Sequence, residues 1–150
     1  MARMHSRKRG KAKSHKPVGR PKPDSELSNK EIEDLIVQLA KDGYTPSQIG
    51  NKLRDEHNVL DVKASLGKKL AQVTKEHDLA LELPEDLRNL VRKAVMLRKH
   101  LQDNKQDEPA KRGLKLTESK VQRLAKHHKD TGKLDKNWKY DWKQYTYLAE

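Results

Sequence analysis

The apolar residues between positions 28 and 56 recur with the period of two α-helices. Residues 28–31, Ser-Asn-Lys-Glu, have the pattern of a capping box, in which serine and glutamate close the first turn of a helix. From Ile32 onward, apolar residues return at offsets 3, 4, 7 and 8, which places them on one helix face, and Asp42-Gly43 ends this helix. Thr45 marks a second, shorter helix, with proline at its first position and Gln48 where a second capping box needs it.

A third helix is expected after Asp61, whose side chain can cap it. Its inward-facing residues are predicted to be Val62, Leu66, Leu70 and Val73. Gly67 lies inside this segment, although glycine has a low helix propensity.

Two longer helices are predicted in the second half of the chain. The first begins at residues 84–86, Pro-Glu-Asp, where proline is tolerated and the carboxylates favour the positive end of the helix dipole. Its apolar residues keep a spacing that suits antiparallel packing, and they are Leu87, Leu90, Val91, Ala94, Val95, Leu97 and Leu101. After a loop at 102–109, the second helix runs from about Ala110 to Lys129, and Thr131-Gly132 end it. Its inward residues are predicted to be Leu114, Val121, Leu124 and Ala125.

No segment shows the alternation of apolar and polar residues that is typical of strands. We therefore predict an all-α protein. Its core is a helical bundle of antiparallel helices, preceded by a small three-helix N-terminal region and a disordered basic arm.

The composition argues against an enzyme with a deep pocket. The 150 residues are 33% hydrophobic and 37% charged, with two tryptophans, four tyrosines and no phenylalanine, so few side chains could wall an apolar cavity. The absence of cysteine excludes disulfides, thiol nucleophiles and Cys-ligated zinc. No apolar run approaches the about 18–20 residues of a membrane span, and the N-terminus lacks the apolar segment of a signal peptide. A soluble, cytosolic protein is expected.

The positive charge is concentrated at the N-terminus. Nine bases and no acid precede Asp24, out of a formal net charge of +12 for the whole chain. These bases are Arg3, Arg7, Lys8, Arg9, Lys11, Lys13, Lys16, Arg20 and Lys22. With almost nothing apolar to bury, this arm is expected to stay disordered until it meets an anion, and nucleic acid fits best. A solubilising arm or a localisation signal is the alternative.

No catalytic, metal or nucleotide site is predicted, and no cofactor. A phosphate-binding loop would need glycine five residues before Gly67, and residue 62 is valine. The adjacent His127 and His128 point to different sides of a helix, and no two histidines lie four apart beside a glutamate, as zinc proteases require. The carboxylate pairs Glu31/Glu33 and Glu85/Asp86 lie at exposed helix starts, where capping explains them.

Five of the six aromatic residues lie in the last eighteen positions, interleaved with Lys136, Lys139 and Lys143. They are Trp138, Tyr140, Trp142, Tyr145 and Tyr147. Aromatics beside bases can stack on unpaired RNA bases, or they can dock the tail onto the chain's own helices. The sequence leaves both interpretations open.

The strongest alternative function is a DNA-binding helix-turn-helix protein. Its third helix would present Lys63, Lys68 and Lys69 to a groove. Recognition helices usually offer Arg, Asn or Gln to base edges, whereas lysines read charge and not sequence, so this alternative is weaker.

Five segments of the chain resemble a known family. They are residues 1–5 (MARMH), 39–50 (LAKDGYTPSQIG), 83–87 (LPEDL), 98–101 (RKHL) and 137–140 (NWKY). In this order and spacing the chain resembles the universal S-fifteen family of small-subunit ribosomal proteins, in its long archaeal and eukaryotic form, which is called S-thirteen in eukaryotes. The resemblance covers essentially the whole chain.

The resemblance implies an all-helical protein that binds 16S-type ribosomal RNA in its central domain. The expected contacts are a three-way junction and a nearby irregular helix read through its minor groove. It also implies a role in ribosome assembly. The expected partners are neighbouring small-subunit proteins and, through an inter-subunit bridge, large-subunit RNA. The expected location is the cytoplasmic ribosome, with no membrane and no small-molecule substrate.

The resemblance also suggests where the chain divides, because the core shared with the shorter bacterial members begins near residue 60 of this chain. We expect a basic arm at 1–27, an N-terminal helical extension at 28–60, an RNA-binding core at 61–132 and an aromatic and basic tail at 133–150.

Several RNA-binding residues follow from the family pattern. The bacterial minor-groove pattern is His, six residues, Asp, two residues, Ser; His100 and Asp107 match it, and Ala110 replaces the serine. In the next helix Arg123 matches a family arginine, while His127 replaces a tyrosine and can still stack on a base. Lys120 precedes Arg123 by three residues and His127 follows it by four, which places the three on one face of that helix. Outside the arm, the candidate residues are His100, Asp107, Lys111, Arg112, Lys120, Arg123 and His127. The bacterial Thr-Gly-Ser turn is not matched by residues 80–82, Ala-Leu-Glu.

Overall fold

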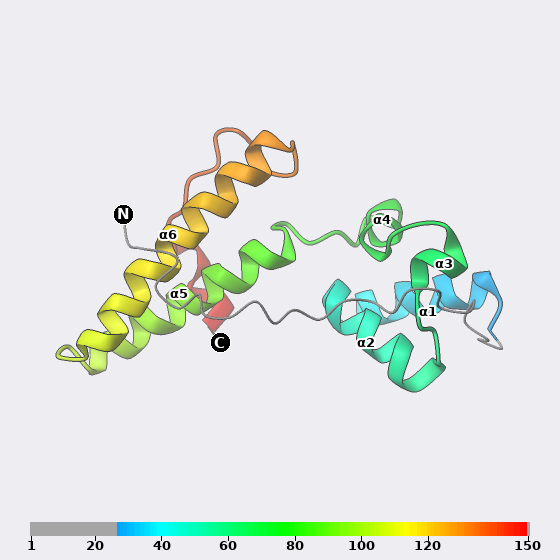
Figure 1. Cartoon of the computed structure of the whole chain (residues 1–150), viewed down its shortest axis with the longest axis horizontal. Coiled ribbons are helices and arrows are strands. Elements are labelled where there is room, and N and C mark those ends of the chain that lie inside the picture. The colour runs from blue at the N-terminus through cyan, green and yellow to red at the C-terminus, as the bar shows by residue number, and fades with distance from the viewer. Residues whose placement is uncertain (1–26, 150) are drawn as a thin grey trace, which may run out of the picture. The chain divides into compact units, whose positions relative to one another are not determined.

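The computed structural model describes residues 27–149, and every regular element among them is a helix (Figure 1). The all-α prediction is confirmed for this part of the chain. The nine bases of the predicted arm lie outside the described residues. None of the described helices is long and apolar enough to cross a membrane.

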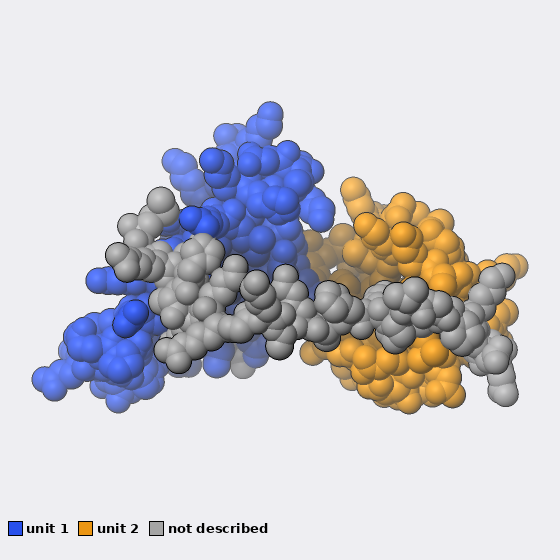
Figure 2. All heavy atoms as spheres, in the orientation of Figure 1, with its two compact units in different colours: residues 1–11, 83–150 blue, residues 12–82 orange. Residues whose placement is uncertain are grey.

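The described residues form two compact units, which are coloured separately in Figure 2. The N-terminal unit comprises residues 27–82 of the described chain and the C-terminal unit comprises residues 83–149. The domain boundary predicted at 60 and 61 falls inside the N-terminal unit. That prediction concerned segments shared with shorter relatives, so packing does not test it.

The first two helices of the N-terminal unit begin as the sequence predicts. Helix α1 (Asn29–Lys41) opens with a capping box in which the Ser28 amide donates to Glu31 Oε2 at 2.7 Å. Helix α2 (Pro46–His57) opens with a second box, in which the Thr45 amide donates to Gln48 Oε1 at 2.9 Å. Two orphan amides of each first turn are thereby satisfied, which fixes both helix starts without help from tertiary contacts.

A small apolar core unites this unit. Its buried residues are Ile32, Ile36, Ile49, Leu53, Val59 and Val73. They come from α1, α2, the segment after α2, and α4 (Leu70–Glu76). Helix α4 packs against both α1 and α2, so these three helices share one apolar core.

The prediction of a single third helix after Asp61 is wrong, because the segment forms two short helices. Helix α3 (Val62–Leu66) ends at Gly67, whose φ of 70° lies in the left-handed region and whose amide donates to the Lys63 carbonyl at 3.0 Å. Helix α4 begins three residues later. Glycine adopts this conformation readily, so it terminates α3 instead of weakening a longer helix, and the unit has four helices where three were predicted.

Replacing Gly67 with alanine is expected to destabilise the N-terminal unit by about 1 kcal/mol, because a side chain is strained at positive φ. A Cβ added there would meet nothing within 4 Å, so the effect isolates backbone conformation. Gly113 lies in the middle of α6 (Glu108–Asp130), also in open space, and Gly113→Ala should stabilise by about 0.5–1 kcal/mol. Urea denaturation followed by circular dichroism measures both; equal signs for the two variants would contradict the assignment of Gly67 as a left-handed cap.

The C-terminal unit is an antiparallel hairpin of α5 (Glu85–Asp103) and α6, against which the 3₁₀ segment η1 (Trp142–Ala149) packs (Figure 1). Its core joins α5, α6 and the tail, and consists of Leu83, Leu87, Val91, Val95, Val121, Ala125, Leu134, Tyr145 and Leu148. Helix α6 begins two residues earlier than predicted, since Asp107 caps it and Pro109 is accommodated in its first turn. The predicted ends near Thr131 and Gly132 agree with the structure.

Candidate nucleic-acid interface

Lys120, Arg123 and His127 lie exposed along one side of α6, while Val121 and Ala125 are buried on the other. We call these three exposed residues the Arg123 face. Their spacing of three and four residues stacks them along one stripe of the helix, as the sequence predicts. Two side chains with positive charge and one aromatic ring thus share a surface that can bind phosphates and stack on a base.

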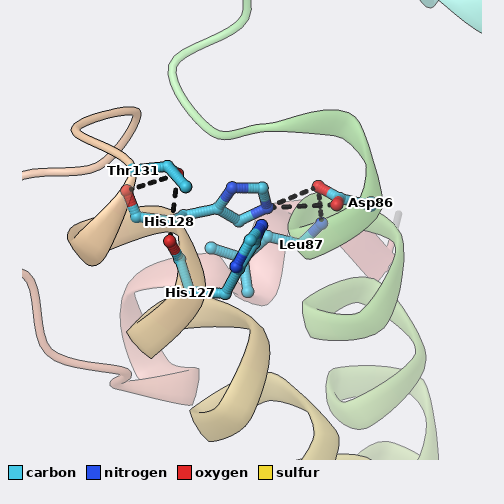
Figure 3. Close-up of polar contacts among 5 residues, drawn as sticks. All are labelled: Asp86, Leu87, His127, His128 and Thr131. Carbon is cyan, nitrogen blue, oxygen red and sulfur yellow. Dashed lines mark hydrogen bonds and ion pairs between the residues drawn. The ribbon is translucent and has the colours of Figure 1, made fainter.

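His127 and His128 point in different directions, also as predicted, but their environments differ more than the sequence suggests. His127 is exposed, whereas His128 retains only 3% of its accessible surface. The buried ring places its Nε2 3.0 Å from each carboxylate oxygen of Asp86, in the first turn of α5 (Figure 3). Asp86 also accepts the Leu87 amide at 2.8 Å.

The role assigned to Asp86 from the sequence was therefore incomplete. The N-cap of α5 is Pro84, and no side chain caps this helix, so the predicted capping role is not found. The helix dipole and the Leu87 amide stabilise the carboxylate locally, and Asp86 also binds a buried histidine 42 residues away. The sequence could have indicated this contact in one way only: in an antiparallel pair, the first turn of one helix adjoins the last turn of its partner. Spacing alone could not show which of the two adjacent histidines faces inward.

Backbone hydrogen bonds fix the last turn of α6 around the same histidine. The Thr131 hydroxyl donates to the carbonyls of His127 and His128 at 2.9 and 3.3 Å (Figure 3). The amides of Lys133 and Leu134 donate to the His128 carbonyl at 2.9 and 3.2 Å. Because His128 is held through both side chain and backbone, the adjacent His127 ring projects from a well-fixed turn.

His100 and Asp107, which the family pattern pairs, lie together across the α5–α6 loop. His100 Nε2 is 2.8 Å from Asp107 Oδ2, and the Asn104 side-chain amide donates to the His100 carbonyl at 3.1 Å. Both side chains remain partly exposed. The loop thus presents an imidazole and a carboxylate at one edge of the hairpin.

Asp107 is also the N-cap of α6. Its Oδ1 accepts the Ala110 amide at 2.9 Å. This amide, and after it the His100 ring, hold the pKa of Asp107 below its usual value of 3.8. Ala110, at the position of the family serine, provides no side-chain donor or acceptor, so the loop has two polar side chains of that pattern and not three.

The lowered pKa of Asp107 predicts its titration. Because the folded pKa is depressed, the cap is complete above the usual carboxyl range and is lost as the pH falls through the lowered pKa. Carboxyl NMR should give a midpoint below 3.8 for Asp107, and in a His100→Ala variant the midpoint should rise but stay below 3.8, since the Ala110 amide remains. A midpoint at or above 3.8 in the unaltered chain would contradict this cap.

The remaining candidates on α6 are Lys111 and Arg112, which differ in their surroundings. Lys111 forms an ion pair with Glu108 one turn earlier, whereas Arg112 is exposed. The nine candidate bases of the arm lie outside the part of the chain that the structure describes.

The tail aromatics mostly dock onto the C-terminal unit. Tyr145 is buried, and Trp138 Nε1 donates to its hydroxyl oxygen at 2.9 Å. Tyr140 and Trp142 pack against the same core, and burial raises the pKa of Tyr140. Of the two interpretations left open by the sequence, docking onto the chain's own helices holds for these four; Tyr147 is the exception, with 52% of its surface exposed.

Comparison with known proteins identifies the chain. The family model described as "Ribosomal protein S15" matches residues 69–147, and the one described as "Ribosomal S13/S15 N-terminal domain" matches residues 1–59. This chain belongs to the ribosomal protein S15 family. The resemblance inferred from the sequence is confirmed.

Relatives within the S15 family align along nearly the whole chain. It is 49% identical over 141 residues to "Small ribosomal subunit protein uS15" of Methanocorpusculum labreanum, covering 93% of each chain. It is 47% identical over 147 residues to the protein of that name from Natronomonas pharaonis, covering 95% of each. For Cenarchaeum symbiosum the identity is 46% over 140 residues, covering 93% of this chain and 95% of the relative.

Charge separates the two units of this S15-family chain. Residues 27–82 contain eight bases and ten acids, whereas residues 83–149 contain 17 bases and nine acids. The formal charges are therefore −2 and +8. An anionic partner is attracted to the C-terminal unit, which contains every described candidate residue.

The helix-turn-helix alternative is not supported. Helix α3 has five residues and is about 7–8 Å long, less than two turns, which is too short for a recognition helix that presents several side chains to successive base edges. Lys68 lies beyond its end and pairs with Glu76 at 2.7 Å. Membership of the S15 family places the chain among ribosomal proteins, the class that the sequence predicts.

Proposed function

We propose that this chain is a structural constituent of the small ribosomal subunit and binds the ribosomal RNA of that subunit. The observation that supports this most strongly is the S15-family match together with relatives named as small-subunit proteins along nearly the whole chain. The charge of +8 on residues 83–149 and the exposed Arg123 face agree with an RNA partner. No bond is made or broken in this function.

The Arg123 face is proposed to bind the three-way junction in the central domain of 16S-type RNA. Lys120 and Arg123 would contact phosphates, and a guanidinium can bind a phosphate through two parallel hydrogen bonds. His127 would stack on a base that the junction leaves unpaired. The Asp86–His128 pair supports this surface from inside, because it fixes the turn from which His127 projects.

The His100–Asp107 pair is proposed to contact an irregular RNA helix through its minor groove. A carboxylate offers about four lone-pair directions, and two of those on Asp107 are used by Ala110 and His100. The others can accept from a guanine amino group or a 2′-hydroxyl, which are the donors of that groove. Because residue 110 is alanine, this contact has one polar partner fewer than the bacterial pattern.

The wider role follows from the family and the charge. We propose that the chain assists assembly in the cytoplasmic ribosome, beside neighbouring small-subunit proteins, and meets large-subunit RNA in an inter-subunit bridge. The nine bases of the arm would neutralise phosphates that otherwise oppose compaction of the RNA.

Hydroxyl-radical footprinting of the full chain on the central domain of small-subunit RNA tests this proposal. We expect protection at the three-way junction and at one adjoining irregular helix. Substituting base pairs that straighten that helix should remove the second footprint and leave the first. Protection spread evenly along every helix would contradict site-specific recognition.

A further inference from the structure

The loop end of the α5–α6 hairpin lacks the apolar core that holds the rest of the C-terminal unit together. We call residues 99–116 the tip; they include the loop between the two helices and carry the His100–Asp107 pair (Figure 1). Between Val95 and Val121, a stretch that the structure describes throughout, no apolar side chain is buried. Burial of apolar surface therefore fixes α5 against α6 only weakly at the tip.

An ion pair joins the two helices at the base of the tip. Arg98 on α5 donates from Nε to Glu118 Oε1 at 3.0 Å, and its Nη2 donates to the same oxygen. Arg98 precedes His100 by two residues, a rise of about 3 Å along the helix. Because the donors of a guanidinium lie in a rigid plane, this contact fixes a direction between the helices as well as a distance.

The docked tail covers this ion pair. The Arg98 guanidinium carbon lies 5.0 Å from the centre of the Trp142 ring, which is within the range of a cation–π interaction. The side chains of Arg98 and Glu118 are 32% and 23% exposed. Since water screens a partly covered pair less than an open one, the tail strengthens the contact between α5 and α6.

We propose that Arg98 and Glu118, covered by Trp142, position the tip so that His100 and Asp107 can contact RNA together. Arg98 and Glu118 are positioning residues, which act through the register of the two helices and not by touching RNA. The inference deepens the proposed function and rests on it. It also gives the aromatic tail a part in RNA recognition, because Trp142 packs on the same guanidinium that sets the register.

The two proposed RNA contacts differ in how much they depend on this register. His100 ends α5 and Asp107 begins α6, so a slip of one residue between the helices moves one side chain about 1.5 Å past the other. Hydrogen bonds weaken steeply with such displacements. The Arg123 face lies on α6 alone, over the buried Val121 and Ala125, and does not need a fixed tip. Loss of the ion pair should therefore affect the minor-groove contact selectively.

Binding to two RNAs tests the proposal. One is the central-domain RNA, and the other is the same RNA with its irregular helix straightened by base-pair substitution. Fluorescence anisotropy gives the ratio of the two affinities, and in Glu118→Ala the preference for the irregular helix should fall about tenfold, the effect expected for one hydrogen bond to a charged group. Arg98→Ala should lower the ratio equally, although the two substitutions change the net charge in opposite directions. The double variant should lose no more than either single variant, because both remove the same contact.

The matched control is Glu76→Ala in the N-terminal unit. It breaks the Lys68–Glu76 ion pair at 2.7 Å and changes the net charge as Glu118→Ala does. It should leave the ratio of affinities unchanged. An unchanged ratio in Glu118→Ala would overturn the proposal. Equal weakening on both RNAs would also overturn it, because the ion pair would then stabilise the whole unit and not position its tip.

Failure of the proposed function gives a different result, since the unaltered chain then does not distinguish the two RNAs. Carboxyl NMR of the free protein decides about the ion pair in that case. The Ala110 amide, and after it the His100 ring, lower the pKa of Asp107. If the ion pair positions the tip, Glu118→Ala should raise the Asp107 midpoint as His100→Ala does, whereas an unchanged midpoint would refute the positioning role without RNA.

Discussion

His128→Ala is expected to lower the free energy of unfolding of the C-terminal unit by about 2–4 kcal/mol. The variant removes a ring that is almost completely buried and leaves a cavity between the first turn of α5 and the last turn of α6. It also removes the hydrogen bonds to Asp86 at 3.0 Å. Both tryptophans of the chain lie in this unit, so denaturation followed by tryptophan fluorescence reports on it selectively.

Two further variants separate packing from hydrogen bonding. Asp86→Asn keeps an acceptor for Nε2, so it should cost less than about 1 kcal/mol, whereas Asp86→Ala leaves a buried donor unsatisfied at about 1–3 kcal/mol. His127→Ala removes the exposed neighbour and should leave stability nearly unchanged. If His127→Ala and His128→Ala destabilised equally, the inward orientation of His128 would be wrong.

Arg123→Ala is expected to weaken binding to the junction fragment by about 1.5–3 kcal/mol, the range for hydrogen bonds to charged groups. Arg123 is exposed and makes no contact with the core, so helicity and unfolding free energy should change little. Filter binding or fluorescence anisotropy at fixed salt measures the loss. Because the residue is proposed to contact phosphates, raising the salt should shrink the difference between variant and parent.

The matched control is Arg54→Ala, an exposed arginine of the N-terminal unit that pairs with Asp55 at 2.8 Å. It changes the net charge by the same amount, far from the proposed RNA surface in the sequence. Equal loss in both variants would show that net charge and not the Arg123 face sets the affinity, and no loss in Arg123→Ala would exclude this face as the contact.

Local sequence signals predicted the helix starts well. The two capping boxes at Ser28 and Thr45 form as expected, since both partners of each box lie within one turn and need no tertiary context. Gly67 shows the limit of this reasoning. A glycine within a periodic segment can either be tolerated or end the helix, and the choice depends on packing of α4 against α1 and α2.

Long-range pairs escaped the sequence. Nothing in the local sequence singles out Asp86 or His128. Only the register of the α5–α6 hairpin brings His128 Nε2 to 3.0 Å from the Asp86 carboxylate. Arg98 and Glu118 meet for the same reason, and the Arg98 guanidinium also lies 5.0 Å from the centre of the Trp142 ring. Heptad spacing predicts that two helices pack, but it does not specify which polar residues face each other along their edges.

The candidate site could be predicted in part from the family's residue pattern and in part from helical periodicity. The family pattern supplied Arg123 and His127, and the spacing of three and four residues placed them with Lys120 on one stripe, which is exposed in the structure. The pairing of His100 with Asp107 came from the family pattern, and the structure adds that Asp107 caps α6. The sequence could not decide how the tail lies, because the docking of its aromatic residues depends on the core that α5 and α6 form.

We propose that the helical C-terminal unit recognises RNA, while the bases of the arm add affinity through their charge. A salt-titrated binding comparison tests this most directly, using the full chain and a variant without residues 1–23, on a three-way-junction RNA and on a random DNA duplex. We expect that preference for the junction survives the truncation, with a salt slope shallower by up to about 8 if all nine arm bases contact phosphates. Equal binding to both nucleic acids that collapses when the arm is removed would contradict it.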